Sequence, residues 1–326
     1  MSREPRMDIC LQDVLEAAQR LSGQVVRTPL LYSDVLSAYT EAKVWLKPEH
    51  WQLTGSFKLR GAYNKMASLT EEERQRGVIT ASAGNHAQGV ALAGRLLAVQ
   101  PLIVVPIGTP ETKLMGISRG GAEVVVHGNF YDEAEAFAYQ LAQQTGRVFV
   151  HAFEDEEVVA GQGTVGLEML SDQPDLDLLL VPAGGGGLIC GMGVVARAAN
   201  RMIEVVGVQS EASPAWYEAF AANQIVEVEY SETWAEGLLG GIGRRNFEWA
   251  QLVVDRFVLV SENDIKAAMR WALATYHWVL EGSGAVALAY VLRERARLQG
   301  RKIGIVLTGG NVDLARLREL MATETD

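Results

Sequence analysis

The fold class follows from the stretch Leu178-Leu179-Leu180-Val181-Pro182-Ala183-Gly184-Gly185-Gly186-Gly187-Leu188. Four successive apolar residues indicate a strand that is buried on both faces, as in a parallel sheet. Four glycines follow, and the run from Leu188 to Ala199 predicts a helix. A strand, a glycine run and a helix together form a cradle in which backbone N–H groups bind an anion such as phosphate. A tight turn is the simpler alternative. A dinucleotide site is disfavoured, because no clean G-x-G-x-x-G with a ribose-binding acid about 20 residues later is present.

Other apolar runs of strand length lie on both sides of this stretch, and they too indicate strands buried on both faces of a parallel sheet. They are residues 102–105, 124–126, 205–208 and 303–307. Between two of them, Asp132 to Gln144 carries apolar residues at the spacing of a one-sided helix. Thr70 precedes three glutamates, as a helix N-cap does, and Gly77 to Thr80 is interpreted as a short apolar turn. The alternation predicts an α/β fold with parallel sheets flanked by helices.

Composition limits the partners and the compartment. A length of 326 residues suits two lobes, and a net charge of −11 disfavours nucleic acid and anionic membranes as partners. Cys10 and Cys190 are far apart and lack metal-ligand spacing, which favours a reducing cytoplasm. Acidic residues interrupt the first thirty positions, so no signal peptide is expected, and no apolar run has the length of a membrane span.

One lysine lies in an unusual context, the string Thr54-Gly55-Ser56-Phe57-Lys58-Leu59-Arg60-Gly61-Ala62. A lone lysine is most often a solvated surface charge. Here an aromatic residue precedes Lys58 and glycines flank it on both sides. A lysine amine forms a Schiff base with a carbonyl, and pyridoxal phosphate (PLP) is the commonest carbonyl cofactor held in this way. Lys58 is therefore a candidate nucleophile.

A second glycine-containing loop, Ser82-Ala83-Gly84-Asn85-His86-Ala87-Gln88-Gly89, leads into a predicted helix. Its N–H groups are suited to an anion, and a substrate carboxylate is the natural candidate. Asn85 has both donor and acceptor atoms and suits a pyridoxal 3′-oxygen. The alternative is an ordinary helix cap. The side chain of His86 is interpreted as a structural hydrogen-bonding group.

These motifs and the closing string Thr308-Gly309-Gly310-Asn311 together resemble the fold-type II PLP enzymes, in the threonine/serine dehydratase and serine racemase branch. The resemblance covers about residues 20–320. It implies a two-lobed fold similar to the tryptophan synthase beta subunit, with a small domain at 56–152 inserted into a large PLP-binding domain of 1–55 and 153–326. It also implies a short form without a C-terminal regulatory domain, and a homodimer or homotetramer.

The resemblance assigns roles residue by residue. Lys58 is the Schiff-base lysine and general base, and Phe57 and Gly237 lie on the two sides of the cofactor. Thr308 stands beside the pyridine nitrogen, where a hydroxyl leaves that nitrogen largely unprotonated and favours elimination over transamination. The implied cofactor-binding residues are Phe57, Lys58, Asn85, Gly184, Gly185, Gly186, Gly187, Leu188, Gly237 and Thr308. The implied substrate-binding residues are Ser82, Gly84, Asn85 and His86.

Three positions depart from the family's pattern. Ala83 replaces a serine that donates a proton on the opposite face in the racemases, so two-base racemisation is disfavoured. Gln209 and Ala215 stand where relatives bind a divalent cation through two acids, so no metal is expected. The segment Leu238-Leu239-Gly240 is less polar than in the usual threonine dehydratases and indicates a reshaped pocket.

The predicted function is that of a PLP-dependent ammonia-lyase, which converts a small β-hydroxy amino acid, L-threonine or L-serine, to a 2-oxo acid and ammonia. One alternative is a dehydratase of another hydroxy-amino acid, either hydroxyectoine-derived or 3-hydroxyaspartate. A serine racemase and a catalytically silent PLP or nucleotide-binding protein are further alternatives. Ala83 argues against the racemase, and Lys58 argues against the silent protein.

Overall fold

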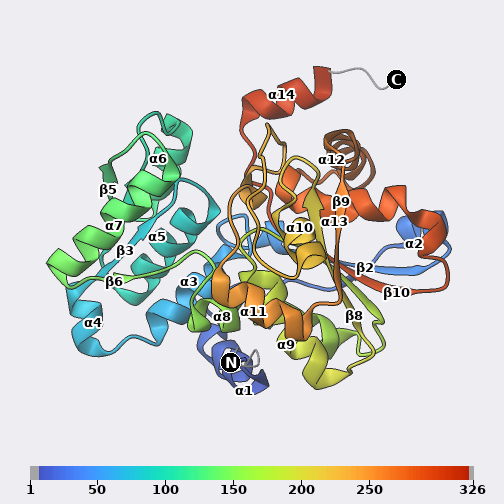
Figure 1. The fold of residues 1–326 in the computed structure, drawn as a ribbon, viewed down its shortest axis with the longest axis horizontal. Helices are drawn as coiled ribbons and strands as arrows, with labels where there is room; N and C mark the ends of the chain where they lie inside the picture. The colour runs from blue at the N-terminus through green and yellow to red at the C-terminus, as the bar shows by residue number, and fades with distance from the viewer. Residues whose placement is uncertain (1–6, 323–326) are drawn as a thin grey trace.

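The computed structural model describes residues 7–322 and arranges its strands in two sheets (Figure 1). Residues 1–6 and 323–326, which the sequence assigns to the large domain, lie outside the described residues. The larger sheet has six strands in the order β1-β2-β10-β7-β8-β9. Its strands are β1 (Leu31–Tyr32), β2 (Lys43–Pro48), β7 (Leu178–Pro182), β8 (Glu204–Ser210), β9 (Arg256–Val260) and β10 (Lys302–Leu307). All neighbouring pairs are parallel except β1 with β2.

Strand β7 is buried on both faces, as its apolar run predicts. Leu178 and Leu180 pack into one apolar cluster, with α12 (Glu262–Tyr276) and α13 (Gly282–Arg293). Leu179 and Val181 pack into another, with α8 (Glu156–Asp172) and α9 (Gly187–Ala199). Because β7 lies between β10 and β8, the glycines that follow it leave the sheet near its middle. The carboxyl end of a central parallel strand is a usual position for a binding site.

The smaller sheet has four parallel strands in the order β5-β4-β3-β6. Its strands are β3 (Val78–Ala81), β4 (Pro101–Val105), β5 (Glu123–Val126) and β6 (Val148–Phe149). Two sequence interpretations are corrected here. Residues 77–80 are not a turn, because 78–80 belong to β3, a fully buried inner strand. Its four residues are too few to show the residue pattern of a strand in the sequence. Strand β5 lies at the sheet edge and exposes Val126, so it is not buried on both faces.

Helices cover the sheets on both sides (Figure 1). They are α1 (Leu11–Leu21), α2 (Asp34–Thr40), α3 (Lys58–Ala67), α4 (Glu71–Arg76), α5 (Asn85–Leu97), α6 (Glu111–Arg119), α7 (Tyr131–Thr145), α8 (Glu156–Asp172), α9 (Gly187–Ala199), α10 (Ala215–Ala222), α11 (Arg244–Val253), α12 (Glu262–Tyr276), α13 (Gly282–Arg293) and α14 (Leu314–Ala322), with 3-10 turns η1 (Glu49–Trp51), η2 (Glu236–Leu238) and η3 (Arg295–Arg297). Thr70 caps α4 through the backbone N–H of Glu73, as predicted. Within residues 7–322, no helix has the length and apolar character needed to cross a bilayer.

Helix α3 lies where the two sheets meet, packed against α5 on one side and α8 on the other. The two helices approach each other closely, because a Cβ on Gly161 would lie 2.8 Å from Gly61 Cα.

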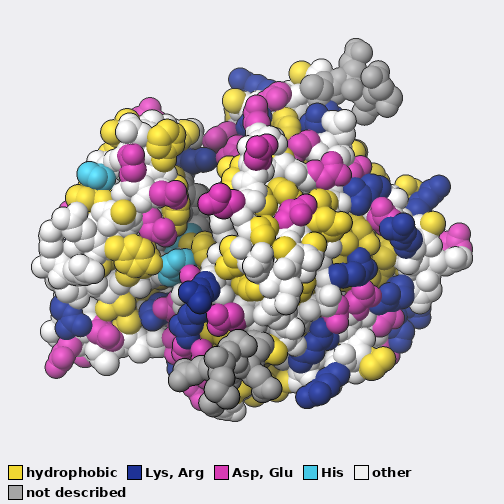
Figure 2. Space-filling model, viewed as in Figure 1, with side chains coloured by type: hydrophobic (Ala, Val, Ile, Leu, Met, Phe, Trp, Pro, Cys, Tyr) yellow, Lys and Arg dark blue, Asp and Glu magenta, His cyan; other side chains and the backbone are white. Residues whose placement is uncertain are grey.

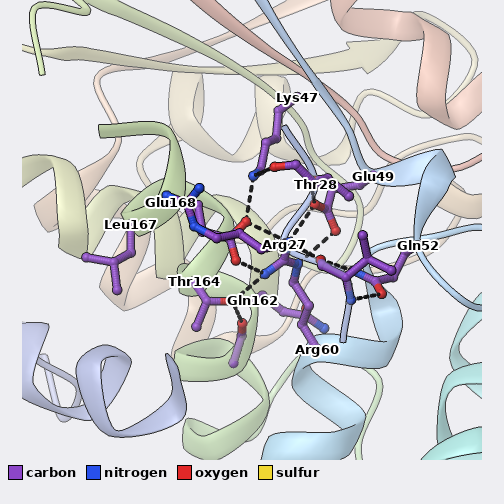
Figure 3. Close-up of polar contacts among 12 residues, drawn as sticks. Arg27, Thr28, Lys47, Glu49, Gln52, Arg60, Gln162, Thr164, Leu167 and Glu168 are labelled. Carbon is purple, nitrogen blue, oxygen red and sulfur yellow. Dashed lines mark hydrogen bonds and ion pairs between the residues drawn. The ribbon is translucent and has the colours of Figure 1, made fainter. Parts of the chain in front are cut away.

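The first turn of α3 is also held by ion pairs (Figure 3). The Arg60 guanidinium binds Glu49 at 2.8 Å and Glu168 at 2.7 Å, and Lys47 Nζ lies 2.5 Å from Glu168. This buried four-charge cluster (Lys47, Glu49, Arg60 and Glu168) joins β2, η1, α3 and α8.

Candidate active site

One cavity of about 840 Å³ brings together every site residue predicted from the sequence. Its lining includes Phe57, Lys58, Ser82, Gly84, Asn85, His86, Gly184, Gly185, Gly186, Gly187, Leu188, Gly237 and Thr308. These residues come from five separate parts of the chain, at 57–58, 82–86, 184–188, 237 and 308. In Figure 2 the surface is hollowed between the part at the left, which carries α5 to α7, and the larger part at the right.

Lys58 is the first residue of α3, and its position is fixed by the end of β10. The Phe57 N–H donates to the Thr308 carbonyl at 3.1 Å, and Ser56 forms an antiparallel bridge with Gly309. The Lys58 amine donates to the Ala152 carbonyl at 2.9 Å. Desolvation in the cavity lowers the pKa of Lys58 to about 8, against the opposing effect of Glu281. A larger share of neutral amine is therefore present near neutral pH than for a solvated lysine.

The glycine loop (Gly184–Gly187) joins β7 to α9. Gly186 has φ +101°, and a Cβ there would lie 2.5 Å from the Trp216 ring. A Cβ on Gly185 would lie 2.2 Å from the Phe153 ring. Only glycine fits at these two positions, because the loop backbone is packed directly against two aromatic rings. Among the described residues, the N–H groups of Gly184, Gly185 and Gly186 have no hydrogen-bond acceptor.

The Ser82–His86 loop joins β3 to α5. Gly84 N–H donates to Ser82 Oγ at 3.2 Å, and a Cβ on Gly84 would meet no atom within 4 Å, so the helix N-terminus faces open space. His86 is buried, with Nε2 3.0 Å from the Val150 carbonyl. Burial, with a smaller effect of Lys58, lowers the pKa of His86 to about 3. The imidazole is therefore neutral and holds the loop to the strand that ends at Phe149.

Asn85 forms a network that sequence reasoning did not find. Its Nδ2 donates to Glu281 Oε1 at 2.7 Å, and its Oδ1 accepts from Asn311 Nδ2 at 2.7 Å. One N–H of the Asn85 amide stays free for a ligand. Desolvation raises the pKa of Glu281 to about 7, against the hydrogen bond from Asn85. Nothing in the sequence near Glu281 shows that this carboxyl group lines the same cavity as Lys58.

Thr308 and Gly237 meet at Ser283, another residue without a role in the sequence analysis. Thr308 Oγ1 donates to the Ser283 carbonyl at 3.3 Å, and Ser283 Oγ accepts from the Gly237 N–H at 2.8 Å. A Cβ on Gly237 would lie 2.9 Å from Ser283 Oγ. The start of α13 therefore fixes the relative positions of two residues that are far apart in sequence.

Another part of the cavity lining is polar and contains Tyr131, Glu135 and His151. His151 Nδ1 accepts from the backbone N–H groups of Phe153 at 3.2 Å and Glu154 at 2.8 Å, which places the proton of the neutral ring on Nε2. Nε2 lies 3.9 Å from Glu135 Oε1, and the Tyr131 hydroxyl donates to the same oxygen at 2.8 Å. Sequence reasoning missed this trio because Tyr131 and Glu135 lie one helical turn apart on the polar side of α7.

Gln209 and Ala215, the positions at which relatives bind a divalent cation, have structural roles in this chain. Gln209 Nε2 donates to the Ala183 carbonyl at 3.2 Å, and its Oε1 accepts from the backbone N–H groups of Trp216 and Tyr217. Ala215 begins α10. Within residues 7–322, no group of three or more His, Cys, Asp or Glu side chains is arranged to hold a metal ion.

Comparison with known proteins identifies the family. The profile described as "Pyridoxal-phosphate dependent enzyme" matches residues 21–309. The chain belongs to this family. It is 45% identical to the L-threonine ammonia-lyase of Thermotoga maritima over 94% of this chain and 76% of that protein. It is 38% identical to the catabolic L-threonine dehydratase of Escherichia coli K12 over 96% of both chains. The structure of maize serine racemase superposes with a TM-score of 0.92 at 32% identity over 97% of both chains.

This PLP-dependent enzyme therefore has the fold-type II architecture that its sequence predicts, with parallel sheets flanked by helices. The residues present fit the cofactor. The glycine loop offers unpaired N–H groups to a phosphate, and Lys58 offers an amine in the same cavity. Thr308 offers a buried hydroxyl to the ring nitrogen of the cofactor.

Proposed function

We propose that this chain is an ammonia-lyase that removes water and then ammonia from a small β-hydroxy amino acid, L-threonine or L-serine, to give a 2-oxo acid. The observation that carries the proposal is the desolvated Lys58 amine, with a pKa of about 8, inside the cavity that also holds the glycine loop. The names of the two curated relatives, an L-threonine ammonia-lyase and an L-threonine dehydratase, support the same reaction.

In this proposal the cofactor is held by residues from both sides of the cavity. The glycine loop and Leu188 would bind the phosphate, Asn85 would bind the 3′-oxygen, and Thr308 would lie beside the ring nitrogen. Phe57 and Gly237 would contact the ring, and Lys58 would hold the cofactor covalently. When bound, PLP supplies an electron sink for the α-carbon of the amino acid.

Lys58 then acts as the general base. Its amine is held near the Ala152 carbonyl at 2.9 Å, and its lowered pKa leaves it able to take the substrate α-proton at neutral pH. The N–H groups at the start of α5, with Ser82 and Gly84, bind the substrate carboxylate. Loss of the β-hydroxyl as water gives an enamine, which after release is hydrolysed to the 2-oxo acid and ammonia.

The pocket for the substrate side chain combines an apolar and a polar wall. Leu238, Leu239 and Gly240 contribute an apolar part of the lining, and Tyr131, Glu135 and His151 contribute a polar part. A screen of 2-oxo acid release over L-threonine, L-serine, 3-hydroxyaspartate and hydroxyectoine-derived amino acids tests the assignment. Turnover of L-threonine or L-serine is expected. Turnover of only the larger or acidic substrates would replace the substrate class, and no 2-oxo acid from any of them would refute the lyase.

Racemisation is the competing outcome, because serine racemases share the fold. Ala83 lines the cavity and has no exchangeable proton, so it cannot donate the proton that a serine at this position supplies in the racemases. D-serine that forms from L-serine as fast as pyruvate would overturn the lyase assignment. Ala83→Ser is expected to raise D-serine formation.

We further propose that residues 56–152 form a small domain inserted between 1–55 and 153–326. All four strands of the smaller sheet fall inside these limits, and all strands of the larger sheet fall outside them. A cytoplasmic homodimer or homotetramer remains part of the proposal, and light scattering of the purified enzyme measures the assembly.

A further inference from the structure

Three successive carbonyl groups at the glycine loop each accept a hydrogen bond from a buried side chain. Gln209 Nε2 donates to Ala183 O at 3.2 Å, Trp216 Nε1 donates to Gly184 O, and Asn246 Nδ2 donates to Gly185 O at 2.8 Å. The donors come from β8, α10 and α11, three elements that follow the loop in sequence. All three side chains are buried.

These bonds fix the direction of the loop's N–H groups. In a trans peptide the C=O and N–H groups point in opposite directions. Holding the carbonyls of Ala183, Gly184 and Gly185 therefore turns the next N–H groups, those of Gly184, Gly185 and Gly186, the other way. Those N–H groups have no acceptor among the described residues, and the loop lines the cavity. A run of glycines has little conformational preference of its own, so its direction has to come from neighbours.

The donors are themselves held in place. Gln209 Oε1 accepts from the backbone N–H groups of Trp216 at 2.9 Å and Tyr217 at 3.1 Å, so one amide connects the loop to the first turn of α10. The Trp216 ring stacks on Phe257 with centroids 4.9 Å apart and an interplanar angle of 11°. Asn246 Nδ2 also donates to the Phe153 carbonyl at 2.9 Å.

We propose that Gln209, Trp216 and Asn246 are positioning residues that preorganise the glycine loop for the phosphate of the cofactor. Preorganised donors bind an anion without the entropic cost of ordering a flexible loop. The inference rests on the proposed assignment of the phosphate to this loop. It does not depend on the amino acid that the enzyme converts.

Trp216→Phe is the sharpest variant, because it keeps an aromatic ring for the stack on Phe257 and removes only the Nε1 donor and part of the ring. The full-length enzyme is stripped of cofactor and titrated with PLP and, separately, with pyridoxal, which lacks the phosphate. The dissociation constant for PLP is expected to rise about 3- to 10-fold, as for the loss of one hydrogen bond. The dissociation constant for pyridoxal is expected to stay unchanged, because Lys58 binds both compounds.

Trp249→Phe is the matched control. Trp249 is also buried, and none of its hydrogen bonds reaches the loop within the described chain. Gln209→Met, which keeps the length of the side chain without a donor, serves if Trp216→Phe does not fold. Equal losses of PLP and pyridoxal affinity would show a general packing effect and overturn the proposal. Unchanged PLP affinity in a folded variant would do the same. A failed 2-oxo acid screen with the expected PLP results would reject the proposed substrate and leave this inference standing.

Discussion

At the scale of single residues, the lysine is the part of the site that the sequence predicts best. Lys58 is recognisable because its neighbours are unusual, and its cavity position agrees with that interpretation. Glu281, Ser283 and Glu135 are not recognisable in the same way. Each lies in a helix or at a helix start, and each reaches the cavity only because distant strands bring those helices together.

Lys58→Ala is expected to abolish both the borohydride-sensitive visible absorbance of the cofactor and 2-oxo acid release. The reason is that alanine has no amine with which to bind the carbonyl of the cofactor or to take a proton. Lys43→Ala, at an exposed position of β2, is the control and should keep both properties. A Lys58→Ala enzyme with normal absorbance and turnover would show that another group binds the cofactor.

Glu281 gives a prediction on pH and stability. Its pKa is raised from 4.5 to about 7 by desolvation, so between these values the folded chain binds more protons than the unfolded chain. The contribution of this group to stability therefore falls as pH rises through that window. For Glu281→Gln, the free energy of unfolding relative to wild type should increase between pH 5 and pH 8. Urea denaturation of the cofactor-free protein measures it, with exposed Glu41→Gln as the control; a difference that is constant with pH would contradict the assignment.

At the scale of elements, the strand, glycine run and helix were predicted from sequence because each has a strong local pattern. The inner strand β3 was missed because only four residues form it, and its place between β4 and β6 depends on contacts distant in sequence. The sequence also predicts only part of the reason why the loop at 184–187 consists of glycine. The sequence suggests close approach to an anion, whereas the structure shows that Gly185 is also packed against Phe153.

Gly185→Ala is therefore expected to lower both PLP retention and the midpoint of thermal unfolding. Its Cβ would lie 2.2 Å from the Phe153 ring, so either the loop or the ring has to move. Gly184→Ala is the milder comparison, because its nearest neighbour would be Gly237 O at 3.2 Å. Dialysis followed by absorbance and a thermal scan measures both properties. Equal effects of the two variants would argue against the packing explanation.

At the scale of the whole molecule, the four-charge cluster holds the lysine-bearing helix between the two sheets (Figure 3). Its two cations and two anions are balanced, so none is left unpaired by its neighbours. Charge patterning in the sequence did not reveal it, since Lys47, Glu49, Arg60 and Glu168 come from three separate segments.

Arg60→Met is expected to destabilise the fold by about 3–5 kcal/mol, because it leaves the buried Glu49 carboxylate without its main partner. Adding Glu49→Gln should restore part of this loss. Arg27→Met is the control, since the Arg27–Asp172 pair is more exposed and is expected to cost about 1 kcal/mol or less. Urea denaturation compares the variants, and an additive double variant would show that Arg60 and Glu49 do not interact energetically.

The central place of β10 also sets an order of events during synthesis. Strand β10 is formed by residues 302–307 and pairs with both β2 and β7, so the larger sheet stays in two pieces until residues 302–307 have left the ribosome. The same strand end holds Phe57 and Ser56, next to Lys58. A nascent chain can fold its smaller sheet early, but it has no complete cofactor site. Cofactor capture thus has to wait for β10, and premature termination before β10 yields a chain without a finished larger sheet.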